Sequence, residues 1–201
     1  MTTTISALYD DYNDTAAAVK ELRGSSIPEA DISIIAHNAE EWRTDEQTGV
    51  ANDAGTGAGI GAAVGGGVGL LAGLGILAIP YVGPLVVGGW LLATVEGAMA
   101  GGVAGATMGA IVGAMTASGI SVDDANVYAE GVRRGGALVI ARVEDDCVNM
   151  ANGILRHYRS VDIAARRSDY QSGGWTTFDE DAPAFTDAQV REERSRYLRA
   201  T

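Results

Sequence analysis

The sequence predicts an α+β fold in which two β-α-β units contribute to one sheet. Apolar and polar residues alternate from Thr3 to Leu8, as in a strand, and the following TAAAVKELR predicts a short helix that ends at Gly24. A second strand is predicted from Ile32 to about Ala36. After Gly136, ALVIARV predicts a strand, CVNMANGILRHY a helix and SVDI a short final strand. Two such units in one small domain are typical of a split ferredoxin-like fold.

The two units share a spacing that supports this interpretation. Ile5 and Ile140 are each followed, at the same intervals, by an aliphatic residue and then by two aspartates that end the strand and begin a helix. The predicted boundaries follow from these units. They are a first half over 1–39, an insertion with a connecting helix over 40–134, a second half over 135–163 and a tail with a short helix over 164–201.

Glycine recurs at every fourth position within the insertion. Positions four apart lie on one side of an α-helix, so each run forms a groove without side chains that another backbone can approach. We expect a helical hairpin with arms of about 55–79 and 85–118, joined at a turn by Pro80, Gly83 and Pro84, because proline lacks the amide hydrogen of a continuous helix. The expected helix-packing and oligomerisation residues are Gly57, Gly61, Gly65, Gly69, Gly73, Gly97, Gly101, Gly105, Gly109 and Gly113.

These glycines need a compensating contact if the segment is helical. Each lowers helix propensity by about 1 kcal/mol relative to alanine, and close helix–helix packing of small-xxx-small faces is the usual compensation. A flexible linker is the alternative, but linkers are polar and aperiodic, whereas Ile, Val, Leu and Ala separate these glycines. Residues 57–62 also match G-x-G-x-x-A, yet no strand precedes them, so a nucleotide-binding site is not expected.

The hairpin must be covered by lipid or by further copies of the chain. From Ala54 to Val122 the only charged residue is Glu96, and each arm is longer than the roughly 20 residues that span a bilayer core. Acidic flanking residues and Glu96 itself weaken the membrane interpretation, because a charge in lipid is costly unless it is paired, for example with Arg133 or Arg134. Membrane insertion and a soluble oligomer core therefore both stay open, and both imply a homo-oligomer.

Composition narrows the function classes. The net charge of −12 argues against nucleic acid as a partner, and the acidic excess lies entirely before residue 156. The start MTTTISALYDD has no secretory-signal pattern and there is one cysteine, so a cytoplasmic setting is expected. His37 and His157 have no spaced partners and no catalytic motif occurs. We therefore expect no catalytic residues, no metal site and no cofactor.

The C-terminal tail combines aromatic and turn-forming residues. Trp175, Phe178 and Phe185 lie in GWTTFDEDAPAFT, and DAQVREERSRYLR then predicts a charged helix. Because aromatic residues are scarce in disordered segments, we expect these three to dock the tail onto its own sheet or onto a neighbouring subunit. A solvated tail is the alternative.

The order of these segments resembles the general stress protein 17M-like family of bacterial heat- or cold-induced proteins. The resemblance covers about residues 3–160 and is most specific in IPYVGP and in the EGVRRGG run that begins at Glu130. It implies a stress-associated protein in the bacterial cytoplasm or on the cytoplasmic face of the membrane. It implies no catalytic residues.

The sequence therefore predicts a non-enzymatic, stress-associated protein whose glycine-zipper hairpin drives membrane association and homo-oligomerisation. A soluble self-assembling cage or filament with the hairpins in its core is the alternative. A third interpretation, a small-ligand sensor or an enzyme that uses the ferredoxin-like sheet, requires a polar pocket on that sheet.

Overall fold

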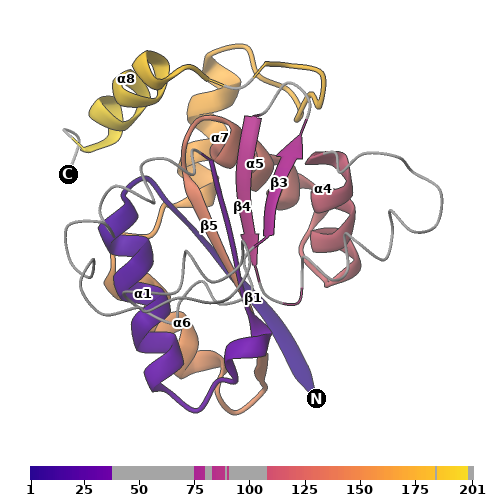
Figure 1. Ribbon diagram of the computed structural model, residues 1–201, viewed down its shortest axis with the longest axis vertical. Coiled ribbons are helices and arrows are strands. Elements are labelled where there is room, and N and C mark those ends of the chain that lie inside the picture. Colours follow the sequence, from indigo (N-terminus) through magenta and orange to yellow (C-terminus); the bar gives the residue numbers. More distant parts are fainter. Residues whose placement is uncertain (38–74, 80–82, 89, 91–107, 184, 199–201) are drawn as a thin grey trace, which may run out of the picture.

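The computed structural model describes residues 1–37, 75–79, 83–88, 90, 108–183 and 185–198. Within these ranges the chain forms one sheet in the order β1-β5-β2-β4-β3, and each strand is antiparallel to its neighbours (Figure 1). Helices accompany the sheet, so the α+β prediction is confirmed. In sheet order the strands are Thr2–Tyr9, Ala137–Glu144, Ile32–His37, Gly83–Gly88 and Gly75–Ile79.

Strand β5 lies between the two strands of the first β-α-β unit. It is antiparallel to both β1 and β2, which are therefore parallel to each other and are joined by α1 (Tyr12–Gly24). The side chain of Asp11 caps α1 by accepting hydrogen bonds from the amides of Asn13 and Asp14. A 3₁₀ turn at Glu29–Asp31 then leads into β2. The structure thus confirms the strand that the alternating residues predict and the helix start that the aspartates predict.

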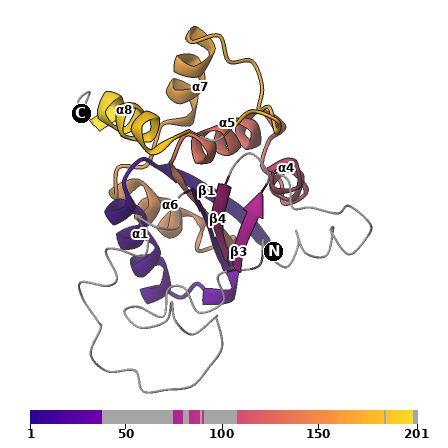
Figure 2. The same cartoon turned by 45° about the horizontal axis from the view of Figure 1, so that its top comes forward.

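The two faces of the sheet are covered by different helices. Ile5, Ala7 and Tyr9 face a buried cluster with α1 and α6 (Val148–His157), whereas Leu8 faces a cluster with α4 (Met108–Ala117) and α5 (Val122–Arg133). Figure 2 shows α1 and α6 on one side of the strands and α4 and α5 on the other. The sheet is thus the middle layer of three, and its central strands are apolar on both faces.

The predicted strand at residues 160–163 is wrong. Asp162 instead caps α7 (Ile163–Ser172) by accepting hydrogen bonds from the amides of Ala164 and Ala165. The amide of Val161 donates to the carbonyl of Leu8 at 2.8 Å, but the chain then turns away from β1. A four-residue strand competes poorly with a capped helix of ten residues, which explains the difference.

The prediction of a helical hairpin is wrong for the described residues on both sides of the expected turn. Residues 75–79 and 83–88 are the strands β3 and β4, and β4 continues the sheet by pairing with β2. Gly83 begins β4 and Pro84 is its second residue, a place where a strand tolerates proline. The aliphatic run suits a strand because β2 would otherwise keep an unpaired edge. Pro80 lies outside the described residues.

Only the last part of the predicted second arm is described as a helix. Gly109 and Gly113 lie on α4. The remaining glycines of the two runs and Glu96 lie outside the described residues, namely Gly57, Gly61, Gly65, Gly69, Gly73, Gly97, Gly101 and Gly105.

The turn from α5 into β5 depends on two adjacent glycines. Gly135 has φ +98°, which favours glycine, and a Cβ on Gly136 would lie 2.9 Å from the carbonyl oxygen of Gly131 and 3.1 Å from that of Tyr9. We expect Gly136→Ala to lower the free energy of unfolding by about 2 kcal/mol, because both neighbours are backbone atoms that cannot swing aside.

Chemical denaturation followed by circular dichroism measures this effect. Gly24→Ala is the matched control, since a Cβ at Gly24 meets no described atom within 4 Å, and it is expected to change stability by about 1 kcal/mol or less. Equal stability of the two variants would show that the turn is not tightly packed.

Candidate functional site

The most strongly charged buried site is centred on Glu130, near the C-terminal end of α5. Its side chain is only 1% exposed. The Arg133 Nε donates to its Oε2 at 2.9 Å, and the Arg134 Nε donates to its Oε1 at 2.6 Å. Spacings of three and four residues bring both guanidinium groups to the same carboxylate. The EGVRRGG run is thus a preformed ion-pair cluster followed by a tight turn.

This cluster connects α5 to the C-terminal tail. Arg134 Nη1 donates to Glu193 on α8 (Asp187–Leu198) at 3.1 Å, and Arg133 Nη1 donates to the carbonyl of Pro183 at 2.7 Å. Burial lowers the pKa of the Arg134 guanidinium, but the hydrogen bonds with Glu130 and Glu193 outweigh burial and raise it overall. The Arg134 guanidinium therefore stays charged, and both arginines hold the tail in place.

A second buried pair joins the tail helices to the first β-α-β unit. Arg166 on α7 is 5% exposed and makes two hydrogen bonds with the carboxylate of Asp10, at 2.9 and 2.5 Å. The ring of Tyr197 on α8 lies 3.5 Å from its guanidinium carbon. Two parallel hydrogen bonds and a stacked ring fix a guanidinium in one orientation.

The three aromatic residues of the tail contact their own chain. Trp175 donates its amide to the carbonyl of Tyr170 at 3.0 Å, and their rings lie edge to face at 5.7 Å. Phe178 packs against the buried α4–α5 cluster, and its amide donates to the side chain of Asn126 on α5. The ring of Phe185 lies against the guanidinium groups of Arg133 and Arg134. Phe178 and Phe185 therefore rest on α5, whereas Trp175 packs on α7, which is itself part of the predicted tail.

Helix α4 presents a different kind of surface. Its inner side buries Ile111, Ala114 and Met115 against the sheet and α5. Gly113 is exposed on its outer side, and a Cβ there meets no described atom within 4 Å. Gly109 lies one turn earlier on the same side, and α4 contains no charged residue. The outer side of α4 is therefore smooth and uncharged.

A polar cleft lies beside β1. Its volume is about 490 Å³, and the hydroxyl of Ser6 donates to the hydroxyl of Tyr128 on its wall at 3.0 Å. Burial raises the pKa of Tyr128, so this hydroxyl keeps its proton at neutral pH. The lining residues are Ser6, Ala7, Tyr128, Asn152, Leu155, Arg156, Ser160, Val161, Asp162 and Ile163.

The structure brings no cofactor-binding or metal-binding constellation together in the ranges that it describes. In those ranges no group of three or more His, Cys, Asp or Glu side chains is placed to share a metal ion. Burial and the neighbouring Asp146 raise the pKa of the Cys147 thiol, which keeps it in its less nucleophilic form. None of the helices in the described part of the chain combines the length and the apolar character needed to cross a bilayer.

Sequence reasoning singled out EGVRRGG without finding its role. It considered Arg133 and Arg134 as partners of Glu96, whereas in the structure both arginines bind Glu130. The available signal was the i+3 and i+4 spacing of the opposite charges. Asp10 and Arg166 are 156 residues apart and carried no comparable signal.

Comparisons with models of known protein families, with curated proteins and with solved structures find no match to this chain. The functional interpretation therefore rests on the residues themselves.

Proposed function

We propose that this chain is a non-enzymatic protein that associates with copies of itself through its uncharged, glycine-rich insertion. The observation that carries the proposal is the outer side of α4, where Gly113 is exposed and faces no described atom. A glycine in a helix interior lowers helix propensity by about 1 kcal/mol, and nothing in the described fold compensates for it. Contact with another backbone is the compensation that this surface fits.

The insertion has a composition that favours burial. Between Ala54 and Val122 the sequence holds one charged residue, Glu96, in a chain with a net charge of −12. Copies of this chain carry like net charge, and charge repulsion opposes contact least through an uncharged segment. The described parts of the segment belong to the fold, since β4 pairs with β2, β3 pairs with β4 and α4 packs against α5, so the insertion is presented from a folded base.

Membrane association is the second candidate, favoured by the same lack of charge. The protein would then lie on the cytoplasmic face of a membrane. A role in the bacterial stress response is part of this proposal, because the glycine-rich insertion and EGVRRGG resemble those of the general stress protein 17M-like family.

The split arrangement of β1, α1 and β2 around β5 supports the finer, ferredoxin-like description of the domain.

Replacing Gly113 with leucine tests the proposal. The change raises helix propensity by about 1 kcal/mol, and a Cβ at this exposed position meets no described atom within 4 Å, so the fold should persist, whereas a side chain here would hold a facing backbone away. We expect Gly113→Leu to reduce the particle mass measured by light scattering without detergent. Gly24→Leu, at an equally open position on α1, is the control.

Two outcomes separate the candidates. A Gly113→Leu chain of unchanged mass would show that α4 is not the contact surface. Flotation of the wild-type protein with anionic vesicles, together with a monomeric mass in their absence, would favour the membrane over self-association.

A further inference from the structure

Strand β1 is an outer strand of the sheet, and the part of the chain that the structure describes leaves most of its outer edge open. The carbonyl of Leu8 accepts a hydrogen bond from Val161, which is not part of the sheet, so the backbone groups of Leu8 point away from β5. Backbone groups in a strand alternate in direction, and those of Thr2, Thr4 and Ser6 therefore point outward as well. Within the described ranges, Val161 provides the one backbone donor to this edge.

The sequence of β1 contains none of the residues that normally prevent pairing with another strand. Its sequence, TTTISALY, is eight residues long and contains no charge, proline or glycine. Threonine, isoleucine and tyrosine also favour extended structure. Natural proteins usually protect a long, uncharged outer strand, so an exposed one indicates an interface.

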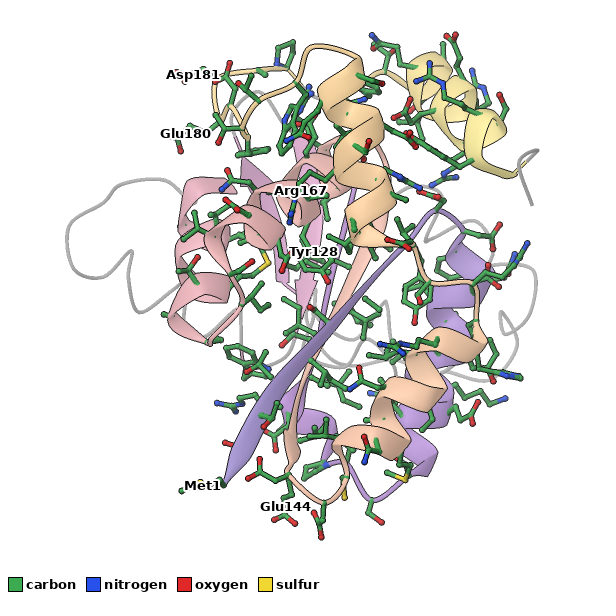
Figure 3. The ribbon with its side chains drawn as sticks, turned by 180° about the vertical axis from the view of Figure 1, so that it is seen from behind. Met1, Tyr128, Glu144, Arg167, Glu180 and Asp181 are labelled. Carbon is green, nitrogen blue, oxygen red and sulfur yellow. The ribbon has the colours of Figure 1, made fainter. Side chains whose placement is uncertain are left out.

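The cleft beside β1 is the space that one more strand would occupy. It is lined by Ser6 on β1, by Asn152 and Arg156 on α6 and by Tyr128 on α5. The two helices belong to opposite layers, so the cleft continues the plane of the sheet. The 160–163 segment closes the cleft at the Leu8 end, and Figure 3 shows β1 crossing in front of the other strands towards Met1.

We propose that the partner at this edge is β1 of a second copy, paired antiparallel to form one continuous sheet across a dimer. Leu8 is already bonded to Val161, which leaves Thr2, Thr4 and Ser6 to form the new ladder. The register that uses all three places Thr2 opposite Ser6 and Thr4 opposite Thr4 of the second copy. Thr4 therefore lies on the two-fold axis.

Charge favours a second copy in this orientation. Glu144 pairs with Thr2, and Asp145 and Asp146 follow it, so the Met1 end of β1 is acidic. Arg156 lines the cleft at the Ser6 end, and the carboxylate of Asp162, the other charged lining residue, accepts the capping hydrogen bonds of α7. Antiparallel pairing brings the acidic end of each copy to the arginine of the other, and the strands themselves carry no like charges.

Helix α6 provides a second contact over the same axis. It packs on β1, and its exposed residues include Met150, which is 42% exposed, and Gly153, where a Cβ meets no described atom. Two α6 helices lie side by side when two β1 strands pair. An exposed methionine next to an open glycine position suits such a helix contact.

Cross-linking at residue 4 tests this interface in the full-length chain. Paired strands place opposite Cα atoms about 5.5 Å apart, within the range of a disulfide. In a Cys147→Ser background, we expect Thr4→Cys to form a disulfide-linked dimer under mild oxidation, and Ser26→Cys, an exposed control, not to do so. Cross-linking of Thr4→Cys no greater than that of Ser26→Cys would overturn the proposal.

A second pair of variants tests the ladder itself. Thr4→Pro removes an outward amide and leaves the bonds to β5 intact, whereas Thr4→Val keeps the amide. In a Gly113→Leu background, we expect the proline variant to have half the particle mass of the valine variant. Equal masses of the two folded proteins would contradict the β1 interface.

These results are independent of the insertion. A Thr4→Cys cross-link that persists in the Gly113→Leu background supports the edge interface even if the insertion does not self-associate. Loss of mass in Gly113→Leu without any Thr4→Cys cross-link supports the insertion alone.

Discussion

Replacing Glu130 with alanine is expected to lower the free energy of unfolding by about 3–5 kcal/mol. The change leaves Arg133 and Arg134 without their shared carboxylate in a largely buried position. Removing one partner of a buried ion pair costs more than the pair contributes, because the remaining charge stays desolvated. The tail should also loosen, since the same arginines hold Pro183 and Glu193.

Urea denaturation measures this loss. Glu144→Ala at the exposed end of β5 is the control and should change stability by about 0.5 kcal/mol or less. If Glu130→Ala unfolds at the same urea concentration as the control, the cluster contributes little and the tail is held by apolar contacts instead.

Removing residues 173–201 is expected to cost about 4 kcal/mol or more of stability. The truncation removes Val190, which is buried, and Phe178 and Phe185, which are half-buried, and full burial of an apolar side chain contributes roughly 1.5–3 kcal/mol. It also removes Glu193 from Arg134. A chain that ends at residue 198 serves as the control. An unchanged melting temperature after removal of 173–201 would show a tail that does not support the fold.

Limited trypsin digestion gives an independent measurement of tail docking. Arg166 is buried against Asp10 and should resist cleavage, whereas Arg191 is exposed on α8. Early cleavage at Arg166 or Arg167, with no loss of the remaining fold, would contradict the docked arrangement.

Local signals in the sequence predicted the first β-α-β unit well. Alternation from Thr3 to Leu8, the aspartates before α1 and the strand at Ile32 all correspond to elements of the fold. Strand β5 and helices α5 and α6 also follow from local periodicity. These segments share clear periods and caps, so local information is sufficient for them.

The aliphatic segment around Pro80 and Pro84 could not be assigned in the same way. An uncharged run of Gly, Ala, Ile, Leu and Val has no polar face, so a helical period and a strand are equally compatible with it. The segment forms β3 and β4 because β4 pairs with the otherwise unpaired edge of β2, and that edge exists only once the sheet has formed. Likewise, the 160–163 segment is not a strand because Asp162 caps the helix α7, which begins at Ile163.

The residues of the candidate site also divide into those that local sequence signals predict and those that depend on distant contacts. Trp175, Phe178 and Phe185 were found because aromatic residues are unusual in a solvated tail. Glu130 was missed because the two arginines that bind it are held by tail residues 50 or more positions later in the chain, Arg133 by Pro183 and Arg134 by Glu193. Spacing alone identifies an ion pair but does not show that it is buried.

The particle mass of the unmodified protein, measured without detergent by sedimentation over a range of concentrations, tests self-association most directly. The chain has a mass of 20.7 kDa. We expect a discrete species of at least twice this mass that dissociates on dilution or in the Gly113→Leu and Thr4→Pro variants. A monomeric mass at every concentration, with no binding to vesicles, would contradict the proposed function.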